Sequence, residues 1–135
     1  MTAVTHSELE TADLAQSLAA RLRAGDILLL SGELGAGKTA FVRGLAQGLG
    51  IDPALVSSPT FTLIHEYRGS GLTLYHADLY RLPSAVPEDL GLEEARDGVL
   101  AIEWPERLAR RLPGVMHLRI DVVGESERRL SLDEE

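Results

Sequence analysis

The residues with the most recognisable chemistry lie in the segment GELGAGKT, where Gly32, Gly37, Lys38 and Thr39 match the pattern G-x-x-x-x-G-K-[ST]. Glycines let the backbone curl so that successive N–H groups point at phosphate oxygens, and the N-terminus of a following helix adds positive partial charge. Lys38 would then reach the β- and γ-phosphates of a nucleotide, and the Thr39 hydroxyl would ligate Mg²⁺. The pattern predicts a phosphate-binding loop made of Gly32, Glu33, Leu34, Gly35, Ala36, Gly37, Lys38 and Thr39.

Mg²⁺ at such a loop needs a further oxygen ligand, usually a carboxylate at the end of a neighbouring strand. Glu103 follows Val99–Ile102, whose unbroken apolar run predicts an interior strand, so we expect Glu103 to be the metal-side carboxylate. Asp78 follows 72–77, where the residues alternate more and an edge or hairpin strand is favoured; it is the second candidate, for a nucleotide or water contact. The alternatives are a helix or turn cap for Asp78 and an ion pair with Arg107 for Glu103.

Four further residues are weighed for supporting roles. Thr60 ends the sequence Ser-Ser-Pro-Thr, at the place where a switch loop carries a threonine that senses the γ-phosphate through Mg²⁺; the alternative is an ordinary turn. His76 alternates with Asp78 on one face and is expected only to hydrogen-bond it. Arg81 is a candidate for positive charge in the transition state, although a surface arginine is more often solvated. Trp104 is expected to pack or to lie at a partner surface.

Hydrophobic periodicity predicts the helices and strands that carry these residues. Ser7 and Glu10 fit a capping box at the start of a helix that runs to Arg23, and Gly50 stops the helix that follows the loop. Strands are expected at 27–30, 61–67, 72–78, 99–102, 116–122 and 128–132, helices at 8–23 and 39–49, and short helices within 83–94 and 105–111. The predicted fold class is α/β, a P-loop NTPase-like sheet between helices with antiparallel hairpin additions, in a single domain, 1–135.

Composition narrows the function classes. A net charge of −8 with dispersed arginines argues against a free-standing nucleic-acid binder, and the lack of cysteine excludes disulfides and thiolate metal sites. No apolar stretch approaches the roughly 18 residues of a membrane span and no signal pattern opens the chain, so a cytoplasmic protein is expected. The chain has no asparagine and Lys38 is its only lysine, so the Asn-Lys-x-Asp loop of GTPases cannot form and ATP is the expected nucleotide.

Several segments together resemble the TsaE family, the P-loop ATPases of bacterial tRNA threonylcarbamoyladenosine (t6A) biosynthesis. Beyond the loop, the combination of SPT, HxDxYR and EWPE is specific to that family, whereas the loop alone is widespread. Ala95 stands where the family commonly has an aromatic residue, and the chain beyond Arg111 matches only loosely. The resembling segments are Glu10-Thr11, GELGAGKTAFVRGLAQGLG (32–50), VSSPTFTL (56–63), YHADLYRL (75–82) and DLGLEEARDGVLAIEWPERL (89–108).

The resemblance implies that ATP and Mg²⁺ bind at the loop, with Thr39 and Glu103 on the metal. It implies that Thr60 and Asp78 support turnover and that Thr11 lies by the nucleotide. It also implies association with a TsaB–TsaD complex, through which tRNA is met only indirectly. Two other readings stay open: a small P-loop kinase of a small-molecule acceptor, and a nucleotide-gated binding module with negligible turnover.

Overall fold

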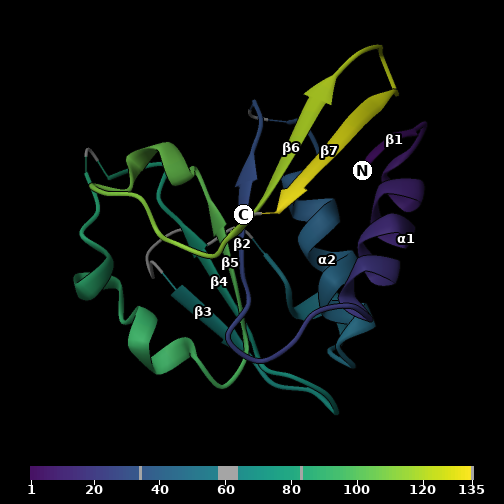
Figure 1. The fold of residues 1–135 in the computed structure, drawn as a ribbon. Helices are drawn as coiled ribbons and strands as arrows, with labels where there is room; N and C mark the ends of the chain where they lie inside the picture. Colours follow the sequence, from purple (N-terminus) through teal and green to yellow (C-terminus); the bar gives the residue numbers. More distant parts are fainter. Residues whose placement is uncertain (34, 58–63, 83, 135) are drawn as a thin grey trace.

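A computed structural model of the chain, describing residues 1–33, 35–57, 64–82 and 84–134, shows a mixed α/β fold built on one sheet (Figure 1). The sheet has seven strands in the order β1-β7-β6-β2-β5-β4-β3. Their bounds are β1 Thr2–Thr5, β2 Ile27–Ser31, β3 Ile64–Tyr67, β4 Leu74–Asp78, β5 Val99–Glu103, β6 Met116–Val122 and β7 Arg128–Glu134.

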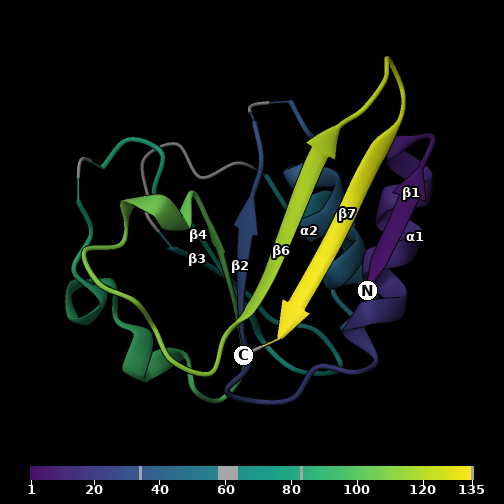
Figure 2. The same cartoon turned by 45° about the horizontal axis from the view of Figure 1, so that its top comes forward.

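The centre of the sheet is parallel and its margins are antiparallel. Strands β6, β2, β5 and β4 run parallel, while β3 pairs antiparallel with β4 and β7 pairs antiparallel with both β6 and β1 (Figure 2). The expected hairpins are therefore present. Asp78 was expected to end an edge or hairpin strand, and the hairpin alternative is confirmed, because β4 pairs antiparallel with β3. The edge alternative is wrong, because β4 lies between β5 and β3 and is almost wholly buried. The short strand β1 was not anticipated, because its four residues carry no apolar alternation.

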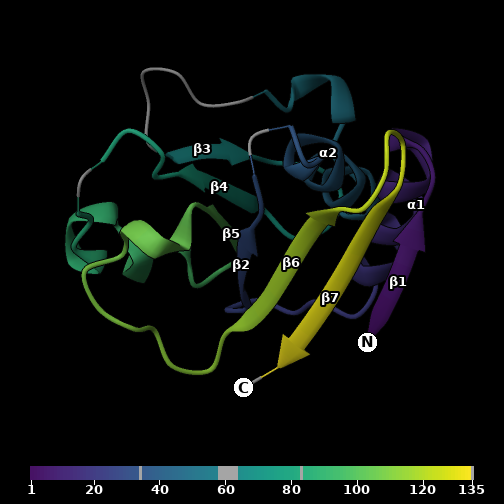
Figure 3. The ribbon, with the colours of Figure 1, turned by 90° about the horizontal axis from the view of Figure 1, so that it is seen from above.

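Both α-helices, α1 (Glu8–Ala19) and α2 (Lys38–Gly48), cover one face of the sheet (Figure 3). They approach closely because α2 presents glycines to α1: a Cβ built on Gly44 would lie 2.1 Å from the Ala12 carbonyl oxygen. A Cβ on Gly48 would likewise lie 2.5 Å from the Ala19 Cβ. Their apolar side chains meet Leu28 and Leu30 of β2 in the larger core cluster. The strand and helix that flank the loop are thus held in one packed unit.

The opposite face is covered by 3₁₀ turns at Pro87–Leu90, Leu92–Ala95 and Pro105–Arg107. These turns and their connecting segments pack on a second core cluster that includes Leu29, Leu100 and Ile102. The sheet therefore lies between helical layers as expected, but this second layer contains only short 3₁₀ turns. The helix expected to reach residue 111 is a single 3₁₀ turn that ends at Arg107, several residues before Pro113 and Gly114. None of the described helices is long and apolar enough to cross a bilayer.

The caps of the helices follow the sequence signals closely. Ser7 Oγ accepts the Glu10 backbone N–H at 3.1 Å, while the Glu10 carboxylate reaches back to the backbone N–H of His6 at 3.0 Å. Gly50 has φ +79°, and the Ile51 N–H donates to the Ala46 carbonyl at 2.9 Å, as in a Schellman cap. Helix α1 ends at Ala19, earlier than the expected Arg23.

Candidate functional site

The loop between β2 and α2 has the backbone shape that its glycines permit. Gly35 and Gly37 have φ of +81° and +107°, values that side chains disfavour, and a Cβ on either would meet nothing within 4 Å. A Cβ on Gly32 would lie 2.7 Å from the Ile120 carbonyl oxygen, so β6 supports the start of the loop. The N-cap of α2 is Gly37, which offers no side-chain acceptor to the first-turn N–H groups. These N–H groups are therefore available to an anion.

Lys38 begins α2 and is 5% exposed. Its Nζ donates to the Gly32 carbonyl oxygen at 2.6 Å and lies 3.9 Å from the centroid of the Trp104 ring. Burial lowers the pKa of Lys38 from its ordinary value, against the opposing charges of Glu103 and Asp78, which raise it. The ammonium thus lies between the loop backbone and the acidic side of the site, where an anionic ligand would offset its desolvation.

The two predicted carboxylates lie next to each other. Asp78 and Glu103 are register partners at the carboxyl ends of β4 and β5, and Glu103 is itself in register with Leu30 on β2, just before the loop. Glu103 is 3% exposed. Burial raises the pKa of Asp78, although the hydrogen bond from the Tyr80 backbone N–H at 3.0 Å lowers it. The turn-cap interpretation of Asp78 is therefore confirmed, and it coexists with a place at the site.

His76 has a different partner from the expected one. Its side chain is fully buried, and its Nε2 is hydrogen-bonded to Glu103 Oε2 rather than to Asp78. The prediction that His76 bonds Asp78 was based on their shared strand face, but the neighbouring strand β5 brings Glu103 closer. Within the described residues the partner of Glu103 is thus His76, and the alternative ion pair with Arg107 is not formed.

Trp104 follows Glu103 and is the only non-glycine residue with positive φ in the described part of the chain, at +59°. Its ring packs on Tyr80, with centroids 4.9 Å apart, and covers the Lys38 ammonium. A left-handed conformation is costly for a bulky residue and is kept only where the surroundings impose it. The expectation that Trp104 packs is confirmed, and its packing partners lie within the site.

Thr11 lies in the wall of a cavity of about 370 Å³ beside the loop. The cavity is formed by the N-terminal end of α1, by the loop and by the turn between β6 and β7. The Thr11 hydroxyl shares a 2.7 Å hydrogen bond with the Thr5 hydroxyl and is 2% exposed. The lining residues are His6, Ser7, Glu8, Thr11, Gly35, Ala36, Gly37, Ala40, Glu125, Ser126 and Arg128.

Arg128, in the first position of β7, is a site residue that sequence reasoning missed. Its Nε donates to the Ala36 carbonyl at 3.0 Å and its Nη2 reaches the Gly35 carbonyl at 3.5 Å. Its Nη1 donates to the carbonyls of Gly124 and Glu127, at 3.3 and 2.9 Å. One guanidinium thus ties the β6–β7 turn to the loop. No sequence signal separated it from the other arginines, because these contacts depend on the fold.

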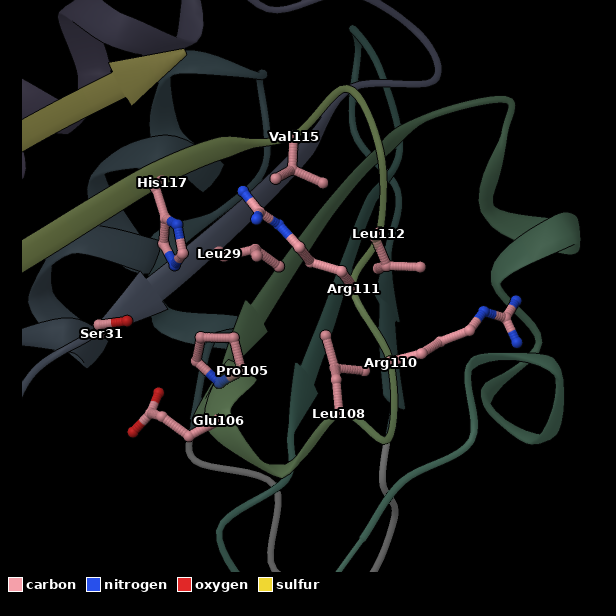
Figure 4. Close-up of a pocket in the computed structure, with 10 residues that line it drawn as sticks. All are labelled: Leu29, Ser31, Pro105, Glu106, Leu108, Arg110, Arg111, Leu112, Val115 and His117. Carbon is pink, nitrogen blue, oxygen red and sulfur yellow. The ribbon is translucent and has the colours of Figure 1, made fainter. Parts of the chain in front are cut away.

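A second cavity, of about 320 Å³, lies on the sheet face opposite α1 and α2 (Figure 4). Leu29, Leu112 and Val115 give it an apolar floor. Figure 4 shows Arg110 pointing away from this cavity, and its guanidinium is paired with Glu88. Of the predicted site residues that the structure describes, none lines this cavity. The remaining lining residues are Ser31, Pro105, Glu106, Leu108, Arg111 and His117.

The structure therefore gathers most of the predicted residues around the loop. Lys38, Asp78 and Glu103 lie together, Thr11 shares the neighbouring cavity, and Thr39 is half-buried in the first turn of α2. Glu33 is exposed. Thr60 and Leu34 lie outside the described residues. Within the described part of the chain, no group of three or more His, Asp or Glu side chains is arranged to hold a metal ion.

Comparison with known proteins assigns the family. The sequence model described as "Threonylcarbamoyl adenosine biosynthesis protein TsaE" matches residues 5–130. The tRNA threonylcarbamoyladenosine biosynthesis protein TsaE of Bacillus subtilis is 44% identical over 125 residues, which are 90% of this chain and 78% of the relative. The corresponding protein of Aquifex aeolicus is 39% identical over 131 residues, covering 96% of this chain and 92% of the relative.

A solved structure agrees with these sequence matches. The crystal structure of Bacillus subtilis YdiB superposes with a TM-score of 0.76 at 36% identity, covering 98% of this chain and 83% of the other. Sequence and fold therefore lead to the same assignment, and this chain belongs to the TsaE family of tRNA threonylcarbamoyladenosine biosynthesis proteins.

Proposed function

We propose that this protein binds and hydrolyses ATP in the presence of Mg²⁺ and that this ATPase activity serves the t6A modification of tRNA. The observation that carries the proposal is the position of Lys38. Its buried ammonium lies between the glycine loop on one side and the carboxylates of Asp78 and Glu103 on the other. A phosphate chain with its counter-cation is the ligand that complements both sides at once.

The residues present fit both groups. The loop offers a cradle of backbone N–H groups at the N-terminus of α2, with Gly35 and Gly37 leaving open space where side chains would stand. The cavity beside Thr11 is contiguous with this loop and gives the nucleoside part a place. Asp78 and Glu103 supply the hard oxygen donors that Mg²⁺ prefers, and Mg²⁺ usually keeps several waters, so few protein ligands suffice.

In this scheme each residue has a distinct part. Lys38, which donates to the Gly32 carbonyl in the ligand-free protein, would pair with the β- and γ-phosphates, and the first-turn N–H groups of α2 would hold the phosphate oxygens. The Thr39 hydroxyl and Glu103 would hold the cation. When bound, Mg²⁺ neutralises charge that develops on the phosphate oxygens. Asp78, the register partner of Glu103, would orient the attacking water, and Thr60 remains the predicted γ-phosphate sensor.

Partners complete the proposed site. The acidic side of the site is half-buried at Asp78, and Glu33 beside the loop is exposed. Closure over the γ-phosphate usually requires an element that covers the site. We assign that role to a TsaB–TsaD complex, which would also carry the tRNA contacts, since a net charge of −8 does not suit direct RNA binding. The isolated protein is then expected to hydrolyse ATP slowly.

The test combines depletion with complementation. The protein is depleted in its own cells, t6A in bulk tRNA is quantified by mass spectrometry, and wild type or Thr39→Ala is restored. We expect t6A to fall on depletion and to recover with wild type only. Unchanged t6A after depletion would reject the role in this pathway, and full rescue by Thr39→Ala would reject the need for metal-assisted ATP chemistry. Phosphate release by the purified protein, with and without the partners, measures the activity itself.

A further inference from the structure

We propose that His76 is the positioning residue of this site: its imidazole fixes the carboxylate of Glu103 so that the second oxygen of that carboxylate serves the cation. This inference rests on the proposed Mg²⁺-dependent function. It concerns a residue that the sequence suggested only as a hydrogen-bond neighbour of Asp78.

The burial of the pair argues for a specific purpose. His76 is 0% exposed and Glu103 is 3% exposed, and the two side chains meet across the β4–β5 pairing, in which His76 is in register with Ala101. A carboxylate taken out of water is costly unless hydrogen bonds satisfy it. Apolar side chains of similar size would fill the same space without that cost. A role in the functional site therefore explains the buried His76–Glu103 pair better than a role in core packing does.

The hydrogen bonds of the ring determine its tautomer. Within the described residues, Nδ1 is buried without a hydrogen-bond partner, whereas Nε2 is bonded to Glu103 Oε2. A proton on Nδ1 would leave a buried donor unsatisfied and would face the carboxylate with a lone pair on Nε2. A hydrogen on Nε2 avoids both costs and leaves only an unpaired acceptor at Nδ1. His76 therefore donates one hydrogen bond to Glu103 and has no other bond to compete with it.

The same contact keeps Glu103 from closing on Lys38. The two groups attract each other, since Glu103 is the largest charge that raises the pKa of Lys38. Nevertheless the ammonium donates to the Gly32 carbonyl and lies under the Trp104 ring, while the carboxylate oxygen Oε2 is bonded to His76. The His76 imidazole thus keeps the Glu103 carboxylate from pairing with the Lys38 ammonium in the ligand-free protein. Groups that orient a ligating side chain in this way tune its affinity for the metal.

The experiment measures ADP affinity by calorimetry, in EDTA and in saturating Mg²⁺, for wild type and two variants. His76→Phe removes the donor, and His76→Gln keeps an amide N–H near the position of Nε2. The matched controls are His65→Phe and His65→Gln, because His65 is the register partner of His76 on β3 and bonds the Tyr67 hydroxyl at 2.9 Å, away from Glu103.

We expect His76→Phe to lose about 10–100-fold in the affinity gained from Mg²⁺, while affinity in EDTA stays within about twofold of wild type. His76→Gln should recover part of the gain, and both His65 variants should behave as wild type. A His76→Phe protein with the full Mg²⁺ gain would overturn the inference. Equal losses with and without Mg²⁺ would also overturn it, because they would show a general structural role.

A spectroscopic measurement covers the case in which His76→Phe does not fold. Nitrogen-15 NMR of the ligand-free wild type should show the His76 ring protonated on Nε2, and this signal should move in Glu103→Gln but not in Asp78→Asn. A ring protonated on Nδ1, or a signal indifferent to Glu103→Gln, would overturn the proposal. Failure of the wild type itself to bind ADP, or to gain affinity from Mg²⁺, would instead reject the proposed function.

Discussion

The two sides of the site are built by different means. On the loop side, from Gly32 to Lys38, the backbone provides the binding groups, and Arg128 supports it through carbonyls. On the strand side, Asp78 and Glu103 provide side-chain charges that are buried or half-buried. Lys38 links the two sides, because it donates to the loop backbone and interacts electrostatically with both carboxylates.

This difference separates affinity for phosphate from the response to a cation. A backbone cradle binds an anion whatever the charge state of nearby side chains, because its N–H groups cannot titrate. A pair of adjacent carboxylates repels itself and needs a cation or a proton to be stable. We therefore expect changes on the loop side to affect all nucleotide binding and changes on the strand side to affect only Mg²⁺-dependent steps. Substitutions on each side of the site test this division.

The largest expected effect is that of Lys38→Ala, because Lys38 belongs to both sides. Removing the ammonium deletes a phosphate partner and leaves Glu103 and Asp78 without the cation that faces them. We expect ATP turnover to fall by about 100-fold or more, as is typical when a charged group at a reacting phosphate or oxyanion is lost. Circular dichroism should stay normal, since alanine is a good helix former at this first position of α2. A folded variant with unchanged hydrolysis would contradict the assignment of the loop.

The next effect is confined to the strand side. Glu103→Gln keeps the shape of the side chain but removes the charge that attracts a divalent cation, so Mg²⁺-dependent turnover should fall by about 10–100-fold. ADP affinity in EDTA should change little, because the loop still holds the phosphates. A collapse of that affinity would show that Glu103 is structural.

Asp78→Asn is the matched variant for Glu103→Gln, because the two residues are register partners with the same chemistry. We expect it to lower turnover while leaving most of the Mg²⁺ dependence of ADP binding. If Asp78→Asn removes that dependence and Glu103→Gln does not, the two carboxylates have exchanged roles, although the division between loop side and strand side would still hold.

The loop side was predictable from sequence because its chemistry is local. The glycine spacing, the preceding apolar strand and the following helix are all contiguous, and Gly50 marks the end of that helix. The strand side was predictable only in part. Glu103 was predicted because it follows an unbroken apolar run, and Asp78 because it ends the second strand of a predicted hairpin. The position of β4 between two other strands was not predicted, since its residues alternate in polarity as edge-strand residues do.

Contacts between distant segments left no sequence signal. The His76–Glu103 pair depends on the register of β4 with β5, and Arg128 reaches the loop from 92 residues further along the chain. Periodicity reports which face a side chain takes on its own strand, not which neighbour it meets on the next. The 3₁₀ turns of the second layer were expected as helices because Pro and apolar residues mark both.

Arg128→Ala tests how far the loop depends on its support. The variant frees the carbonyls of Gly35 and Ala36 from the β6–β7 turn, so the loop should exchange its amide hydrogens faster and bind ADP several-fold more weakly, with or without Mg²⁺. The control is Arg129→Ala, the next residue, whose exposed guanidinium lies 3.7 Å from the Asp121 carboxylate. Equal ADP affinities for the two variants would show that the loop keeps its shape unaided.

The smallest expected effect is on stability and follows from the raised pKa of Asp78. Burial makes the folded protein hold the Asp78 proton at pH values where the unfolded chain has released it. The folded state therefore binds more protons in this window, and stability falls as pH rises from the unfolded pKa of 3.8 through the folded pKa. Above that window the ionised carboxylate lowers the stability of the folded state by a constant amount.

Asp78→Asn removes the charge but keeps an oxygen for the Tyr80 N–H, so it should raise the Tm by a few degrees at pH 7 and by less at pH values near 4. Thermal melts of the ligand-free protein at several pH values measure this. A variant less stable than wild type at pH 7 would mean that the ionised Asp78 is held by Lys38 more strongly than burial opposes it, and the strand side would then need no cation to be stable.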